Sequence, residues 1–277
     1  MLFIGKYNHL TIARSTDFGL FLEDVQGDEV LLPNRYVTDD MKIDDTITVF
    51  VYNDSEDRPV ATTETPLIVR NEFAYLEVKE VNATGAFLDW GLSKDLFVPF
   101  REQPAPMRAG EKYVVFLYLD HKTSRLLASA KINKFLENER LTVIEGDEVD
   151  LLIWERTDLG YNVIVNQYHK GLVYHNEIFR NIQVGDTCKG FVKKIREGNK
   201  LDIALEKPGV ERFEPLIQRI MDELNTNGGF LPLNDDSSPE SIHNRLEMSK
   251  KNFKKSIGNL YKKGIIDMEE NGIRLKS

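Results

Sequence analysis

The segment Phe18-Gly19-Leu20-Phe21-Leu22-Glu23 recurs 66 residues later as Thr84-Gly85-Ala86-Phe87-Leu88-Asp89. Two further blocks keep this spacing: Leu31-Leu32-Pro33 with Phe97-Val98-Pro99, and Thr48-Val49-Phe50-Val51-Tyr52 with Val114-Val115-Phe116-Leu117-Tyr118. Self-similarity at a fixed period is the signature of repeated structural units. Several blocks at one offset therefore predict two copies of the same small domain.

A third, more divergent copy follows at a spacing of 75 residues. Gly85 corresponds to Gly160, and Val98-Pro99 corresponds to Val173-Tyr174. Each unit spans about 65–75 residues and contains β-branched and aromatic runs between Gly, Asn, Asp and Pro turns, which is typical of strands. A unit this short with about five strands protects its edges best by closing into a barrel, where a glycine suits a bulge or tight bend.

The C-terminal segment changes to a helical period after the turn Lys207-Pro208-Gly209. Ser238 and Ser249 are good N-caps for a second and a third helix, and Gly264 suits the end of the third. Asn271-Gly272 between two strand-like runs is a strong hairpin signal. Three helices and a hairpin predict a winged-helix domain. The apolar positions that define the first helix are Leu216, Ile217, Ile220, Met221 and Leu224.

The predicted fold class is therefore mainly β and multidomain: three tandem five-stranded OB-fold barrels followed by a C-terminal winged helix. The predicted domains are residues 1–66, 67–138, 139–209 and 210–277. A length of 277 residues suits several small domains.

The signature segments resemble those of S1-type RNA-binding domains, which are OB-fold barrels. The matching residues are Asp17–Leu22, Gly171–Glu177 and Val184-Gly185-Asp186. The order of the modules, with the segment Met248–Lys255 and Leu260-Tyr261-Lys262, resembles the bacterial conserved virulence factor B family over essentially the whole chain. Members of that family are described as RNA-binding proteins that influence gene expression, so the resemblance implies the same here.

The S1 resemblance also implies where RNA would bind: aromatic residues on the second and third strands and an acidic–basic pair around the last hairpin. Carried over, the positions are Phe18, Phe21, Pro33, Asp54 and Arg58 in the first unit, Thr84, Phe87, Pro99, Asp120 and Arg125 in the second, and Leu159, Asn162, Tyr174, Arg196 and Lys200 in the third. Prolines replace the third-strand aromatic twice, and the third unit lacks both second-strand aromatics, with Tyr161 as a nearby substitute.

Charge is unevenly distributed along a chain with a formal net charge of −9. Residues 1–70 hold six basic and thirteen acidic side chains, whereas nothing acidic lies between Ser249 and Gly264.

Unstacked bases of single-stranded RNA favour aromatic platforms flanked by basic groups. The predicted RNA-binding residues are Phe18, Phe21, Arg58, Phe87, Arg101, Arg125, Tyr174, Lys193, Arg196, Lys200, Lys250, Lys251, Lys254 and Lys255. The first unit is predicted to be the weakest of these sites, and Trp90 is expected to contribute to the second.

Catalytic and metal-binding signatures are missing from the sequence. The five histidines are scattered without ligand spacing, and the single cysteine, Cys188, allows no internal disulfide or multi-cysteine zinc site. No phosphate-binding glycine loop or Gly-x-Ser-x-Gly elbow occurs. We therefore expect a protein that is not an enzyme, has no cofactor and no metal, and acts in the cytoplasm away from membranes.

The sequence leaves three non-catalytic functions open, with an enzyme that degrades RNA as a fourth and weaker alternative. The main hypothesis is a non-catalytic regulator of gene expression that binds single-stranded RNA. Alternatives are a DNA-binding transcription regulator that uses the winged helix, and a protein-interaction adaptor, since both folds also bind proteins. A solvated lysine-rich surface without a ligand is the structural alternative for the third helix.

Overall fold

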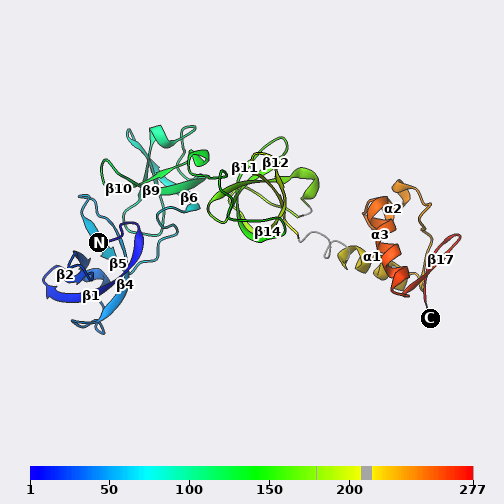
Figure 1. Ribbon diagram of the computed structural model, residues 1–277, viewed down its shortest axis with the longest axis horizontal. Helices are drawn as coiled ribbons and strands as arrows, with labels where there is room; N and C mark the ends of the chain where they lie inside the picture. Colours follow the sequence, from blue (N-terminus) through cyan, green and yellow to red (C-terminus); the bar gives the residue numbers. More distant parts are fainter. Residues whose placement is uncertain (179, 207–213, 277) are drawn as a thin grey trace. The chain divides into compact units, whose positions relative to one another are not determined.

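The computed structural model describes residues 1–178, 180–206 and 214–276 (Figure 1). The predicted turn at 207–209 and the predicted boundary between 209 and 210 lie outside these residues. The chain separates into two compact units, one with the first two β domains and most of the third, the other with the C-terminal domain and the remaining strand segments. Every described helix is too short or too polar to cross a lipid bilayer.

The first domain is a closed barrel of five strands. Its strands are β1 (Lys6–Thr16), β2 (Gly19–Glu23), β3 (Glu29–Pro33), β4 (Thr46–Asn53) and β5 (Pro59–Thr62). They pair in the order β1-β2-β3-β5-β4. Side chains alternate as expected for strands around a core: Leu20 and Leu22 are buried, whereas Phe21 between them is only partly buried.

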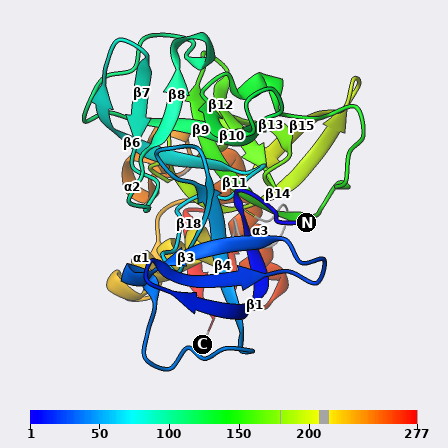
Figure 2. The same ribbon diagram turned by 90° about the vertical axis from the view of Figure 1, so that its left-hand side faces the viewer.

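The second domain repeats this strand order without the same closure. Its strands are β6 (Phe73–Val81), β7 (Gly85–Leu88), β8 (Leu96–Pro99), β9 (Lys112–Asp120) and β10 (Arg125–Ser129). They form a five-stranded sheet in the order β10-β9-β6-β7-β8, with β7 and β8 side by side in Figure 2. β8 and β10 contact each other, but within the described residues the sheet is not closed into a barrel.

The third domain is again a closed barrel. Its strands are β11 (Glu148–Arg156), β12 (Gly160–Val165), β13 (His169–Tyr174), β14 (Thr187–Arg196) and β15 (Lys200–Ala204). They pair in the order β11-β12-β13-β15-β14, which matches the first barrel. The molecule is therefore mainly β with five-stranded barrels. The predicted count of three barrels is not confirmed, because two domains are closed barrels and the described strands of the second domain form an open sheet.

One glycine and one bulge recur in all three domains. Gly19 lies opposite Pro33, Gly85 opposite Pro99 and Gly160 opposite Tyr174. A Cβ atom at these glycines would lie 2.0, 2.4 and 1.9 Å from a carbonyl oxygen of the next strand, so only glycine fits there. The preceding strand carries a register shift in each domain, between Ile12 and Arg14, Val78 and Glu80, and Ile153 and Glu155. The glycine and the bulge occur at the same place in each domain, so the 66- and 75-residue offsets between the glycines reflect a repeated strand arrangement.

The C-terminal domain has helices α1 (Glu214–Thr226), α2 (Pro239–Leu246) and α3 (Lys250–Lys262). A three-stranded sheet follows the order β16 (Phe230–Leu231), β18 (Gly272–Leu275), β17 (Ile266–Glu269). The predicted caps are confirmed: Ser238 Oγ accepts a hydrogen bond from Ser241 N at 3.1 Å, and Ser249 Oγ accepts one from Asn252 N at 3.3 Å. The short strand β16 was not expected from the sequence.

The first and second domains share a hydrophobic core. Trp90 is 2% exposed and packs edge-on against Phe50 and Tyr52 of the first barrel, with ring centroids 5.8 and 6.1 Å away. The expectation that Trp90 offers an exposed stacking surface was therefore wrong, because its ring is almost fully buried between two domains. A second cluster joins Phe73 and Phe116 to Leu152 and Ile164 of the third domain.

Candidate nucleic-acid interface

The third barrel carries an aromatic ring and a guanidinium group that face each other. Arg196 at the end of β14 places its guanidinium carbon 5.3 Å from the centroid of the Tyr174 ring at the end of β13. Arg196 Nε also donates to Asp202 Oδ2 at 2.6 Å, and this hydrogen bond raises the pKa of Arg196. Asp202 is 7% exposed, so this carboxylate is largely shielded from solvent while it orients the cation. Lys193 and Lys200 are exposed on β14 and β15.

The first barrel places a similar pair on its first two strands, with Arg14 on β1 and Phe21 on β2. The guanidinium carbon of Arg14 lies 3.8 Å from the centroid of Phe21. Arg14 Nη2 also lies 2.8 Å from Glu29 Oε2, and the hydrogen bond from Arg14 holds the pKa of Glu29 below its usual value. Arg14 thus covers one face of the ring and is itself engaged by a carboxylate.

The other predicted residues of the first barrel lie at its turns. Phe18 is 76% exposed between β1 and β2. Arg58 at the end of the β4–β5 turn pairs with Asp54 at 2.8 Å and with Glu56 at 2.9 Å. These two carboxylates already engage Arg58, and the ranking of the first unit as the weakest RNA site stays a prediction.

The second domain brings two phenylalanine rings together. Phe87 on β7 and Phe97 on β8 pair in register, with ring centroids 5.0 Å apart. Arg125 at the start of β10 forms an ion pair with Asp57 of the first barrel. Arg101 is exposed in the short 3-10 helix Phe100–Glu102 and does not line the cavity that Phe87 and Arg125 share.

The third domain departs from the S1 pattern as the sequence indicated. Asn162 occupies the position of Phe21 and Phe87 and donates to Glu155 Oε2 at 2.6 Å. Tyr161, the nearby substitute, is partly buried and packs edge-on against His175, with ring centroids 5.7 Å apart. Tyr174 therefore supplies the aromatic surface next to Arg196.

Helix α3 has one apolar and one basic face. Phe253, Ile257 and Leu260 are buried in the core of the winged helix. Lys251, Lys254 and Lys255 are exposed, whereas Lys250 is partly buried and its Nζ lies 3.4 Å from the carbonyl oxygen of Asp236. Lys254 Nζ is 3.8 Å from Asp235. The lysines of this basic face can attract phosphate groups.

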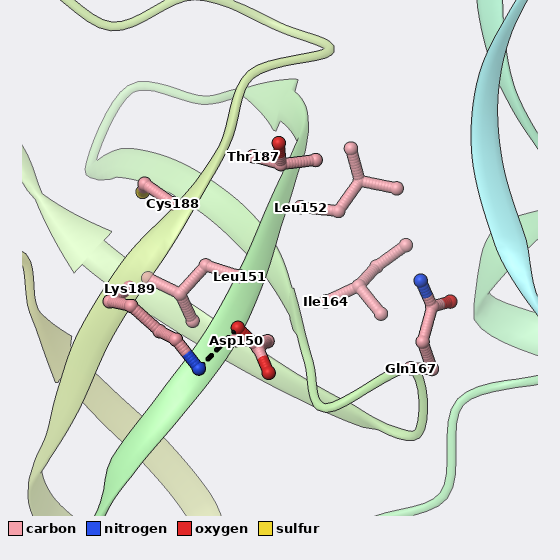
Figure 3. Close-up of a pocket in the computed structure, with 8 residues that line it drawn as sticks. All are labelled: Asp150, Leu151, Leu152, Ile164, Gln167, Thr187, Cys188 and Lys189. Carbon is pink, nitrogen blue, oxygen red and sulfur yellow. Dashed lines mark ion pairs between the residues drawn. The ribbon is translucent and has the colours of Figure 1, made fainter.

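A cavity of about 270 Å³ on the third barrel contains no catalytic constellation (Figure 3). Asp150 and Lys189 form an ion pair there at 2.7 Å. Burial raises the pKa of the Cys188 thiol, which disfavours the reactive thiolate. Among the described residues, no group of three His, Cys, Asp or Glu side chains could hold a metal ion.

Three contacts at these surfaces were not predicted. Phe97 could have been found, because the 66-residue repeat and the pairing of Gly85 with Pro99 place it opposite Phe87. Arg14 reaches Phe21 only because a bulge shifts the register of β1. The pairing of Asp57 with Arg125 depends on how two domains pack, for which the sequence carries no periodic signal.

Comparison with known proteins identifies the domain types of the chain. An S1 domain model matches residues 4–64 and 72–131, and a CvfB-like winged helix domain model matches residues 218–275. Uncharacterized protein YitL of Bacillus subtilis is 28% identical over 278 residues, covering 97% of this chain and 92% of that protein. Conserved virulence factor B of Staphylococcus saprophyticus is 26% identical and covers 98% of this chain and 94% of its own length. A solved structure of a multidomain protein with nucleic acid binding domains from Streptococcus pneumoniae is 24% identical over 99% of this chain and 98% of that chain, with a TM-score of 0.42.

The chain is thus built from S1 domains and a CvfB-like winged helix domain, and these domain types support nucleic-acid binding. Its full-length similarity is to proteins named Conserved virulence factor B, which confirms the resemblance drawn from the sequence.

Proposed function

We propose that this protein binds single-stranded RNA without catalysis and regulates gene expression in the cytoplasm. The observation that carries the proposal is the pair of Tyr174 and Arg196, in which a ring and a guanidinium group lie 5.3 Å apart at the strand ends of an S1-like barrel. Bases stack on aromatic rings and phosphates pair with guanidinium groups, so one such pair can hold one nucleotide.

Repetition of weak sites supports useful affinity. We take the second domain as a third OB-type unit, because it keeps the strand order, the glycine and the bulge of the two barrels. Stacking contributes about 1–3 kcal/mol per base, and sites on one chain reinforce each other through their high effective concentration. The chain therefore needs no single high-affinity pocket.

A competition assay tests this proposal. The intact chain is titrated at two salt concentrations with a short single-stranded RNA, the same sequence as DNA, and a DNA duplex. We expect preference for RNA and weaker binding at the higher salt concentration, since phosphate contacts release counterions. Labelled RNA should stay intact during the incubation. Failure to bind any of the three nucleic acids would favour the adaptor function.

Duplex DNA binding by the winged helix is the second candidate. It is favoured by α3, whose exposed side carries Lys251, Lys254 and Lys255. Recognition helices of related folds enter the major groove of duplex DNA. Preference for the duplex in the same assay, lost on replacement of these three lysines by glutamine, would establish this function in place of RNA binding.

A further inference from the structure

A cavity of about 460 Å³ lies where the β4–β5 turn of the first barrel meets the second domain. Phe87 and Phe97, with their rings 5.0 Å apart, line it together with part of Trp90. Cavities of this size hold small organic ligands, and aromatic rings favour flat ones.

Two cations and two carboxylates line the same cavity, and one of the carboxylates, Asp95, forms an ion pair with Lys79 at 3.0 Å. Arg125 Nη2 pairs with Asp57 Oδ2, and Lys94 Nζ lies 3.8 Å from Asp57 Oδ1. Burial lowers the pKa of Lys94, so an anion in the cavity stabilises its charged form. A single carboxylate from the neighbouring domain thus occupies the place where both cations would receive a phosphate.

The carboxylate of Asp57 is held at the tip of a tight turn. Its φ angle is 64°, in the left-handed region, and its backbone N–H donates to the carbonyl oxygen of Asp54 at 3.0 Å. The side chains of Asp57 and Arg125 are 33% and 53% exposed. Ion pairs with this much solvent contact contribute little to stability, so another anion can replace the carboxylate readily.

We propose that this cavity binds one nucleotide of a single-stranded RNA, with the base against Phe87 and Phe97 and the phosphate at Arg125 and Lys94 in place of the Asp57 carboxylate. Asp57 is then a built-in competitor that weakens RNA binding by the second domain. The inference rests on the proposed RNA binding and adds a site made by two domains together.

The test compares Asp57→Asn with Asp39→Asn in titrations with a uridine decamer. Both variants lose one negative charge from the first barrel, but only Asp57 lines the cavity. Asparagine tolerates the left-handed backbone, so the turn is kept. We expect Asp57→Asn to bind about twofold to fivefold more tightly than Asp39→Asn, and Arg125→Gln to bind about tenfold more weakly than the unchanged chain.

A local readout uses the fluorescence of Trp90, one of two tryptophans in the chain, after replacement of the other by Trp154→Phe. The decamer should change Trp90 emission, whereas inorganic phosphate alone should not. Equal effects of phosphate and decamer would reduce the cavity to an anion site and overturn the proposal. So would RNA binding that is unaffected by Asp57→Asn and Arg125→Gln. Absence of any RNA binding by the unchanged chain would instead refute the proposed function.

Discussion

The first and third barrels have the same backbone plan but different outer surfaces. Both close five strands in the same order. In both, a Cβ atom added to the shared glycine would lie within 2.0 Å of a carbonyl oxygen of the next strand. In the first barrel, the ring of Phe21 is covered by Arg14, which pairs with Glu29. In the third barrel, Tyr174 faces an arginine that is oriented by the buried Asp202.

The comparison shows which positions the fold restricts. Close backbone approach fixes Gly19 and Gly160, because no other residue fits. Outward side chains are under no such constraint, so their charge can diverge while the barrel persists. The backbone plan therefore predicts the fold of both barrels, and the outer residues determine what each barrel binds.

The largest expected effect is on the shared backbone plan. Gly160→Ala should destabilise the third barrel by about 3 kcal/mol, because the new Cβ atom would lie 1.9 Å from the carbonyl oxygen of Val173. Urea unfolding measures this loss. Gly198→Ala is the control: its φ angle is 72° but its Cβ would meet nothing within 4 Å, so only about 1 kcal/mol should be lost. Equal losses in both variants would show that the close approach is not the reason for glycine.

An intermediate effect is expected on RNA binding. Tyr174→Ala should weaken binding of a single-stranded RNA about tenfold, since one stacked base is lost. Phe21→Ala should change it by no more than about twofold, because Arg14 and Glu29 already occupy the surroundings of that ring. Fluorescence anisotropy gives both affinities. A larger loss in Phe21→Ala than in Tyr174→Ala would reverse the ranking of the two barrels.

The smallest effect concerns the pH dependence of the first barrel. The pKa of Glu29 is lowered in the folded state by its hydrogen bond from Arg14, so this pair stabilises the fold above the unfolded pKa of Glu29. The stabilisation is lost as pH falls through the lowered pKa. In Arg14→Gln, NMR titration should find the Glu29 pKa closer to its ordinary value. The difference in unfolding free energy between Arg14→Gln and the unchanged chain should disappear in acid. A difference that persists in acid would mean that Arg14 stabilises the fold by packing on Phe21 and not by its ion pair.

Much of the fold could be predicted because local signals agreed with it. The serine caps at 238 and 249 and the Asn271-Gly272 turn occur where the structure has helix starts and a hairpin. The repeated glycines predicted related domains. Closure of the second sheet could not be predicted, because barrel closure depends on how β8 and β10 pair and not on the residue pattern of either strand.

The candidate site was predictable only within single domains. Tyr174 and Arg196 lie in one barrel, and the S1 resemblance led to both. The environments of Trp90 and Arg125 depend on packing between domains, so neither the burial of Trp90 nor the ion pair of Arg125 with Asp57 could be predicted from the sequence. Long-range contacts of this kind have no periodicity from which they can be inferred.

The burial of Trp90 between Phe50 and Tyr52 also bears on how the protein is synthesised. The strands of the first barrel are complete at Thr62, but Trp90 follows 28 residues later. Domains generally fold as they leave the ribosome, N-terminal first. Phe50, which packs against Tyr7 within the first barrel, and Tyr52 would thus lack their contacts with Trp90 until the second domain emerges. The first barrel would gain its full stability only after that domain has been translated.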